Sequence, residues 1–258
     1  MNLAIAHLLA LGVTHVLMVN DDARFDPADV LALLHRTADP GIGAAAPVTV
    51  RPDGRVETAG LRLAPLSRRG VEHLGLHDCP PDGLVDAVQG SCVMVRVGVL
   101  EDLGLLDEEY FYSWEDVEWC VRLRRQAELR SLVDRGARCL HVGSPSMGGT
   151  ATYNPVAEYL LVRNMLRFQE STGMPALAVE ENLRYWVANC TWDSHRNRGR
   201  SSPDPMTAVA AMASAVRDFR SMTFGCWPRE LETLPGATVS VTGGAAYARP
   251  DEVLVIAP

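Results

Sequence analysis

The first part of the chain alternates between helical and strand-forming segments, and this alternation limits the possible folds more than any other feature. "NLAIAHLLAL" has a helical composition and ends before Gly12, and "VTHVLMV" is a short apolar run typical of a strand buried on both faces. Asp26 before Pro27 predicts the start of a helix over "ADVLALLHRTAD", and "IGAAAPV" predicts the next strand. The pattern predicts an open α/β sheet flanked by helices, in which ligands bind beyond the carboxyl ends of the strands.

Further along the chain, shorter apolar segments predict additions to this sheet. "VDAVQGSCVMVRV" predicts two short strands around Gln89, Gly90 and Ser91, which we expect to be antiparallel additions. "LRSLVD" and "ARCLHV" predict two final strands, the second of which ends at His141.

The segment "YFYSWEDVEWCVRLRR" predicts a helix that begins with acidic residues. Ser113 is the predicted N-cap, and the helix is expected from Trp114 to Gln126. Glu118 and Arg122 have the i,i+4 spacing of a surface ion pair. The positions expected to face inward are Val117, Cys120, Val121 and Leu123.

Beyond Thr150 the chain is predicted to be mainly helical, over residues 155–171, 177–193 and 205–222. The last thirty or so residues contain "ATVSV" and "EVLVIA", to which the sequence assigns no place in the fold. We therefore expect an α/β domain over residues 1–150, a helical region over 151–222 and a tail over 223–258.

Composition narrows the class of protein. The 258 residues are 47% hydrophobic, which is enough for one large domain with a smaller appendage. The formal charge is −8 and the chain has no lysine, which argues against nucleic-acid binding. The six cysteines lack CxxC spacing and predict buried free thiols in the cytoplasm. No apolar run reaches the roughly 18 residues of a membrane span, and the N-terminal segment lacks the basic start of a signal peptide.

Two pairs of acidic residues are candidates for chemistry. Asp21 and Asp22 follow a buried strand, where carboxylates can bind Mg²⁺ or Mn²⁺ together with a substrate diphosphate; the alternative is a turn with solvated acids. Glu115 and Asp116 lie in the first turn of a helix, where an ionised carboxylate can serve as a general base; the alternative is favourable charge at a helix N-terminus.

Other candidates have equally plain structural alternatives. Trp114 is a sugar-stacking platform or a core residue, and His141 is a metal ligand or a hydrogen-bonded structural histidine. His73, His77 and Cys79 have zinc-like spacing, but three ligands alone are a weak signal. The arginines of "SRRG", "RLRRQ" and "RNRGR" suit a diphosphate or an anionic membrane surface, with solvent exposure as the default.

The order of these segments carries more information than any one of them. "VNDDARFDPADVLALL", "VQGSCVMVRVGVLEDLGLLDEEYFYSWEDVEWCVRLRR", "ARCLHVGSPSMGG" and "EYLLVRNMLRF" follow one another along the chain. In this order and spacing, residues 2–168 resemble the family 2 inverting glycosyltransferases of the GT-A fold, above all their rhamnosyltransferase-like and galactofuranosyltransferase-like branch.

The resemblance implies roles for the acidic residues and for His141. Asn20, Asp21 and Asp22 match the family's DxD-type metal and diphosphate motif, and Asp22 is the implied main ligand because Asn replaces the first acid. His141 matches a histidine that joins the metal shell in some members. Mn²⁺ or Mg²⁺ is the implied cofactor.

The same resemblance implies a substrate site. Gln89, Gly90 and Ser91 match a turn beside the donor sugar and the acceptor, and Trp114 matches the acceptor-site aromatic residue. In the acid pair, Asp116 is the implied base and Glu115 the residue that grips acceptor hydroxyls. The remaining matches are Arg163 and Asn164, an "RN" pair expected near the diphosphate.

The implied activity is inverting transfer of a sugar from a nucleoside-diphosphate sugar to a hydroxyl of a saccharide, a lipid-linked glycan or a natural product. The expected location is the cytoplasm or the inner face of the membrane; peripheral membrane contact and self-association are left open.

Family members normally begin with a nucleotide-binding segment that precedes the point where this chain starts. A late start codon, a shortened chain and a natural half-domain are the possible explanations. The alternative function is therefore a catalytically silent half-domain that binds another chain through its exposed sheet edge.

Overall fold

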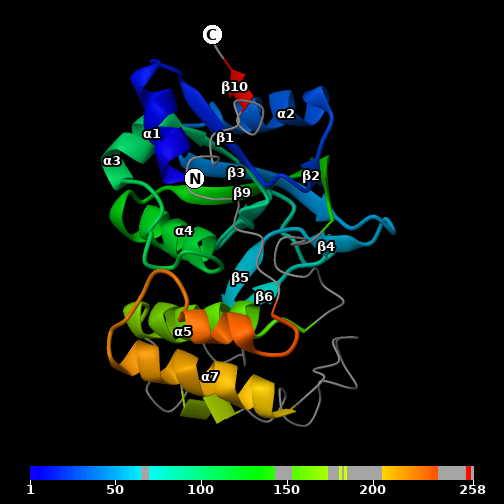
Figure 1. The fold of residues 1–258 in the computed structure, drawn as a ribbon. Coiled ribbons are helices and arrows are strands. Elements are labelled where there is room, and N and C mark those ends of the chain that lie inside the picture. The colour runs from blue at the N-terminus through cyan, green and yellow to red at the C-terminus, as the bar shows by residue number, and fades with distance from the viewer. Residues whose placement is uncertain are drawn as a thin grey trace.

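The computed structural model describes residues 1–64, 70–142, 153–173, 180–181, 183–184, 205–237 and 254–256. In these ranges a mixed sheet lies between helices, as Figure 1 shows. The strand order is β10-β1-β8-β3-β9-β2, with β4 paired to β3 and β7 paired to β9. The strands are β1 (His15–Val19), β2 (Ala23–Arg24), β3 (Ile42–Val50), β4 (Val56–Thr58), β7 (Leu84–Val85), β8 (Cys92–Arg96), β9 (Arg130–His141) and β10 (Leu254–Ile256).

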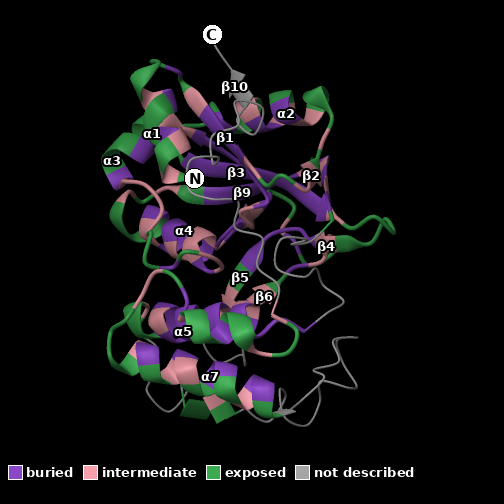
Figure 2. Ribbon diagram, in the orientation of Figure 1, coloured by how far each residue is buried: buried purple, intermediate pink, exposed green. Residues whose placement is uncertain are grey.

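Helices cover both faces of this sheet, as its alternating apolar side chains require. Leu17 and Met94 pack with Val30 and Leu33 of α2 (Pro27–Thr37) on one face. Val16 and neighbouring residues pack on the other face in the larger cluster, to which α1, α3 and α4 contribute. These helices are α1 (Asn2–Ala10), α3 (Val97–Leu103) and α4 (Glu115–Gln126). Figure 2 shows the resulting buried layer along the central strands.

The predicted α/β class is confirmed, and β8 is antiparallel as expected, although it is a central strand of the sheet and not an addition to it. It lies between β1 and β3 and is antiparallel to both, so β1 and β3 run parallel to each other. Val93, Met94 and Val95 are at most 3% exposed, which is the burial expected of a central strand.

The two strands predicted after the acidic helix are one strand, β9, which pairs in parallel with β3 between Arg130 and Leu140, with an interruption after Asp134. The pairing shifts register opposite Pro47 and Val48. There Oδ1 of Asp134 accepts hydrogen bonds from the backbone N–H groups of Gly136 and Ala137, at 2.8 and 3.2 Å. The irregularity that looked like a strand break is thus a bulge within one strand.

The capping prediction for the second helix is confirmed, and that for the acidic helix is off by one residue. Asp26 and Asp29 form a capping box at the start of α2. In α4 the N-cap is Trp114, not Ser113, and it makes no side-chain cap bond, because an indole N–H can donate but not accept. Both Ser113 and Trp114 have left-handed backbone conformations. The expected inward positions of α4 are buried, and Arg122 pairs with Glu118 at 2.9 Å.

The C-terminal half supplies a helical layer, seen at the lower end of Figure 1. It contains α5 (Pro155–Ser171), α7 (Pro205–Arg220) and the short 3-10 helix η2 (Arg229–Thr233). The two-stranded sheet of β5 (Leu61–Ala64) and β6 (Gly70–His73) lies between this layer and the main sheet in the same view. A buried hydrogen bond from Tyr159 to Asp218, 2.7 Å long, joins α5 to α7.

Some expectations fall outside the described residues, including most of the helix over 177–193, the domain boundary near residue 150 and Cys190. Leu254–Ile256 of the "EVLVIA" segment pair antiparallel with β1. Four described cysteines are buried free thiols, while Cys226 is exposed. In the described part of the chain, no helix combines the length and the apolar character needed to cross a bilayer.

Candidate active site

The candidate residues converge at the edge of the sheet where β1, β3 and β9 end. β1 runs into Asn20, Asp21 and Asp22, and β9 ends at His141. β8 runs the opposite way, so the turn that precedes it lies beside the end of β1, and the N–H of Asn20 donates to the carbonyl of Ser91 at 3.1 Å. Asn20, Asp21, Asp22 and His141 therefore lie at the carboxyl ends of parallel strands, as the sequence predicted.

Asp22 and His141 face each other at this edge. Nε2 of His141 is 3.4 Å from Oδ1 of Asp22, and the two side chains are 6% and 9% exposed. The side-chain amide of Asn20 lies 3.5 Å from the same Nε2 atom. Asp21 is exposed in the turn. The structure thus brings together two of the three predicted metal ligands.

A residue that the sequence analysis did not single out, Glu57 of β4, completes this cluster. Its Oε2 atom is 2.8 Å from Nδ1 of His141. The hydrogen bond to Glu57 raises the pKa of His141, although burial opposes it. Burial alone would raise the pKa of Glu57, but the hydrogen bond and charge of His141, with Arg51 and His73, lower it. A lone Glu in "RVETAG" gives no local signal of this role.

The acid pair is tied to the turn before β8. Oδ2 of Asp116 accepts the backbone N–H of Gly90 at 2.7 Å, and Oδ1 accepts the N–H of Val117 at 2.8 Å. Glycine at position 90 allows this close contact, because a Cβ atom there would lie 3.2 Å from Cβ of Asp116, so that Asp116 would have to shift by a few tenths of an ångström. Together with the bond from Asn20 to Ser91, these contacts connect both candidate acid groups through one turn.

Burial shifts the titration of both acids upward. Desolvation, followed by the charge of Asp116, raises the pKa of Glu115 to about 8. Desolvation also raises the pKa of Asp116, opposed by its hydrogen bonds from backbone N–H groups. These shifts oppose the expectation that the helix N-terminus keeps the pair ionised, because burial favours the protonated acids more than the helix start favours their charge. Carboxyl groups with perturbed pKa values are candidates for proton transfer near neutral pH.

Several buried polar atoms around this turn lack a hydrogen-bond partner within the described ranges. They are Oε1 of Gln89, Nε1 of Trp114 and Oε2 of Glu115. Buried polar atoms are normally satisfied, so an orphaned group calls for an explanation.

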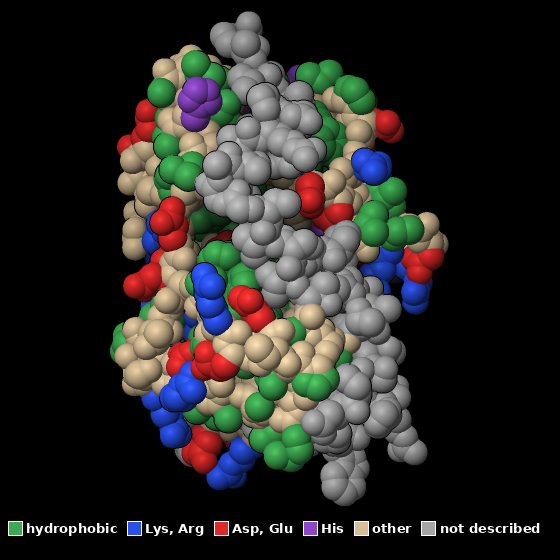
Figure 3. All heavy atoms as spheres, in the orientation of Figure 1, with side chains coloured by type: hydrophobic (Ala, Val, Ile, Leu, Met, Phe, Trp, Pro, Cys, Tyr) green, Lys and Arg blue, Asp and Glu red, His purple; other side chains and the backbone are tan. Residues whose placement is uncertain are grey.

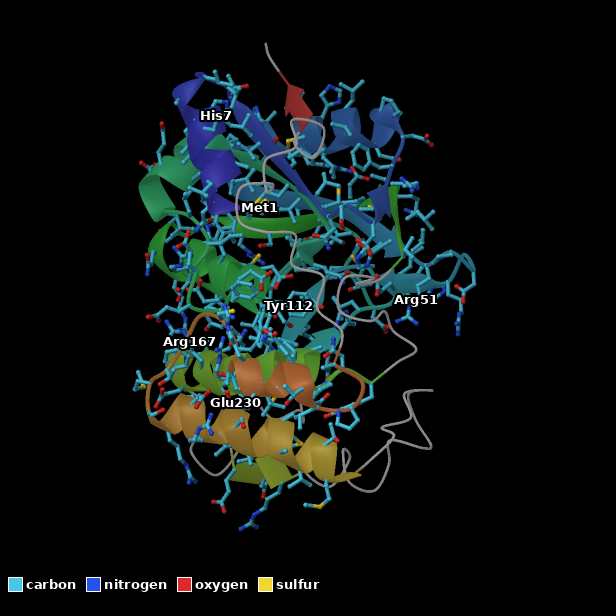
Figure 4. All side chains as sticks on the ribbon, in the orientation of Figure 1. Met1, His7, Arg51, Tyr112, Arg167 and Glu230 are labelled. Atoms are coloured by element: carbon cyan, nitrogen blue, oxygen red, sulfur yellow. The ribbon has the colours of Figure 1, made fainter. Side chains whose placement is uncertain are left out.

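Trp114 is a buried residue, 6% exposed, whose ring stacks on Phe168 of α5 with centroids 5.1 Å apart. Its predicted role as the acceptor-site aromatic stays a prediction. The exposed aromatic side chain of the same loop is Phe111, which is 50% exposed and meets Trp227 edge-on. Figure 4 shows Tyr112 between α4 and α5.

Arg163 and Asn164 are fully buried in α5 and hold the loop before α4. Nδ2 of Asn164 lies 2.6 to 3.0 Å from the carbonyl oxygens of Tyr110, Tyr112 and Ser113. Arg163 donates to further carbonyls, including that of Gly225 at 2.7 Å. We therefore expect both residues to act on the site through the loop, rather than by contacting a diphosphate.

This loop has an unusual backbone. Phe111, Ser113 and Trp114 have φ angles of 59°, 68° and 78°. A left-handed conformation at a residue other than glycine costs about 1–3 kcal/mol, so such a loop persists only where its surroundings hold it. The hydrogen bonds from Asn164 provide that support and set the point at which α4, with its acid pair, begins.

The structure does not show a complete metal-binding group. Among the residues that the structure describes, no group of three or more His, Cys, Asp or Glu side chains is arranged to hold a metal ion. This applies to His73, His77 and Cys79, and equally to Asp21, Asp22 and His141, so a cation bound by Asp22 and His141 stays a prediction. On the face shown in Figure 3, arginine and acidic side chains are interspersed.

No protein-family model matches the chain. An N-acetylglucosaminyl-diphospho-decaprenol L-rhamnosyltransferase of Mycobacterium tuberculosis is 29% identical over 150 residues, 52% of this chain and 48% of the relative. An O-antigen biosynthesis protein of Myxococcus xanthus is 30% identical over 156 residues, 57% of this chain and 12% of the relative. A hexosyltransferase of low-salt glycan biosynthesis from Haloferax volcanii is 43% identical over 42 residues, 16% of this chain and 14% of the relative.

These names support a glycosyltransferase relationship for the chain, which spans about half or less of the length of the curated relatives it matches. A solved structure of GalNAc-T7 with UDP, GalNAc and Mn²⁺ has a TM-score of 0.46 and 12% identity, and the match covers 86% of this chain and 40% of that one. That likeness is too distant to bear on the site.

Proposed function

We propose that the chain is the catalytic part of a metal-dependent, inverting glycosyltransferase with a GT-A-like fold, as in family 2. It moves a sugar from a nucleoside-diphosphate sugar to a hydroxyl group of a glycan acceptor. The mycobacterial relative is named for a lipid-linked acceptor, which supports a lipid-linked glycan, alongside a saccharide or natural product. The free buried thiols fit a reducing compartment, so we place the reaction in the cytoplasm.

One observation carries the proposal: a possible metal-binding pair and a positioned acid pair meet at one edge of the sheet. Asp22 and His141 lie where β1 and β9 end, and Asp116 reaches the Gly90 turn beside them. A reaction that moves a group from a diphosphate to a hydroxyl needs both functions side by side, one to bind the diphosphate and one to take a proton.

The donor set fits a divalent cation. One carboxylate oxygen and one imidazole nitrogen lie 3.4 Å apart, and two ligands of one six-coordinate ion at about 2.1 Å are about 3 Å apart. Ions such as Mg²⁺ use one or two protein ligands and take the rest from phosphate and water, which agrees with the small protein set. A bound cation would neutralise charge on the departing diphosphate.

Asp116 is the proposed base. Its two backbone hydrogen bonds fix the carboxylate at the start of α4, and each oxygen keeps a second lone pair for an acceptor hydroxyl. Asp116 takes the hydroxyl proton while the acceptor oxygen bonds to the anomeric carbon. The bond from that carbon to the diphosphate breaks, and its electrons leave with the diphosphate. Oε2 of Glu115, which is buried and orphaned, is placed to hold a second hydroxyl.

The test is calorimetric titration of the full chain with UDP-, dTDP- and GDP-sugars, each with and without Mn²⁺. We expect one nucleotide to bind in the presence of metal and the binding to be lost in Asp22→Ala. The exposed hairpin variant Asp53→Ala is the matched control and should bind as wild type does. Binding that is indifferent to metal and to Asp22→Ala contradicts the metal site, and no binding of any nucleotide sugar contradicts the donor class.

The proposed base has its own test once a donor is found. Asp116→Asn should still bind donor and metal but lose transfer by at least about a hundredfold, because positioned base catalysis contributes about 10²–10⁴ in rate. Turnover retained in Asp116→Asn would remove Asp116 from this role.

A further inference from the structure

We propose that Glu57 is a positioning residue that orients His141 as a ligand of the divalent cation. This inference rests on the metal-dependent site of the proposed function and adds a residue to it. Glu57 is 84 positions from His141 in sequence, but its Oε2 atom is 2.8 Å from Nδ1 of the imidazole.

The hydrogen bond to Glu57 decides which ring nitrogen of His141 is unprotonated and can bind a metal ion. A carboxylate can only accept, so the proton of the neutral imidazole stays on Nδ1, and the lone pair is on Nε2. Nε2 is the atom that lies 3.4 Å from Oδ1 of Asp22 and 3.5 Å from the amide of Asn20. Glu57 thus presents the ligand atom of His141 to Asp22. Metal-bound histidines commonly have such a partner on the other ring nitrogen.

The backbone around Glu57 explains how it reaches this place. In the pairing of β3 with β4, Thr49 pairs with Thr58 and Val50 pairs with Val56, so Glu57 is the extra residue of a bulge. A bulge turns a side chain out of the regular alternation, and bulges are frequent beside active sites. On its other edge β3 carries the last residues of β9, with Val50 opposite Leu140, the residue before His141.

The surroundings of Glu57 favour this role over a surface ion pair. Its side chain is 14% exposed, whereas its neighbour Val56 is an exposed hydrophobic residue. Arg51, which Figure 4 shows beside β4, is 3.9 Å from Oε1 and 48% exposed, so that pair is weak. A carboxylate is costly to bury without a partner, and the short hydrogen bond to His141 is what offsets the cost.

The experiment measures Mn²⁺ affinity directly, by electron paramagnetic resonance of free Mn²⁺ in titrations of the full chain. We expect Glu57→Gln, which has nearly the same shape, to weaken binding 10- to 100-fold. The matched control is Glu72→Gln on β6, whose side chain is 44% exposed and pairs with Arg62. It should bind Mn²⁺ as wild type does. Asp22→Ala, which removes a ligand, should lose more affinity than Glu57→Gln.

The outcomes separate this inference from the proposed function. Wild-type affinity in Glu57→Gln, with binding lost in Asp22→Ala, overturns the role of Glu57 and leaves the metal site standing. Lower unfolding stability of Glu57→Gln without lower Mn²⁺ affinity also overturns it, because the residue would then only pair with His141. No Mn²⁺ binding by the wild-type chain removes the metal site and this inference with it.

Discussion

Replacing Asn164 with alanine tests whether the loop before α4 is held by α5. Nδ2 of Asn164 has two N–H groups for the carbonyls of Tyr110, Tyr112 and Ser113, and Oδ1 accepts Nε of Arg163 at 3.0 Å. The substitution removes the amide donor from the part-buried carbonyls of Tyr112 and Ser113 and the acceptor from one guanidinium N–H, while the carbonyl of Tyr110 keeps the backbone N–H of Tyr112. Such a group costs about 1–3 kcal/mol when it is fully buried, and two of these three are only part-buried, so we expect a loss in the lower part of the summed range, about 3–5 kcal/mol in unfolding free energy.

The assay is urea unfolding followed by tryptophan fluorescence. A domain of this size has a urea slope toward the upper end of about 1–3 kcal/mol per molar, so the midpoint should fall by about 1–2 M. Asn164→Asp keeps the acceptor for Arg163 but points oxygen at the loop carbonyls. We expect it to be destabilised at least as much, which would assign the effect to the lost donors.

The control is Asn2→Ala, which removes a similar amide with bonds to the backbone of Leu106 nearer the surface. Water can replace those bonds, so a loss of about 1 kcal/mol is expected. A loss for Asn164→Ala no greater than that for Asn2→Ala would refute the reasoning, because the left-handed loop would then be stable without the amide.

Three further changes have distinct expected results. The pKa of Glu115 is about 8 in the folded protein, against an ordinary 4.5 in the unfolded chain. As pH rises from about 4.5 to about 8, the unfolded state therefore loses this proton first, and the free energy of unfolding falls. Glu115→Gln is neutral at every pH and should flatten that slope in urea unfolding measured between about pH 5 and 9. Gly90→Ala forces a methyl group against Asp116 and should cost about 1–3 kcal/mol by urea unfolding, and stability equal to wild type would mean that the turn moves freely. Leu123→Ala empties a fully buried position and should cost about 2–5 kcal/mol in the same assay, with a loss below 1 kcal/mol showing that the core collapses into the space.

The sequence alone determined where most helices and strands lie and which residues follow the carboxyl ends of β1 and β9. The start of α2 was readable because Asp26 and Pro27 act within one turn, and the inward face of α4 because its apolar residues repeat at the helical period. Asp22 and His141 were each expected at the end of an apolar strand, where ligands bind in an α/β sheet. That they share one metal site was implied only by the resemblance to the glycosyltransferases.

The tertiary structure alone decided which distant segments meet. The central place of β8 depends on pairing with β1 and β3. β9 continues through a bulge, although the local sequence there resembles a break between two strands. Glu57 reaches His141 by a bulge against β3, and Asn164 reaches the loop before α4 across more than fifty residues. Such contacts leave little trace in local sequence, because periodicity and capping record only interactions within a few residues, while strand order and buried polar partners follow from how the whole chain packs.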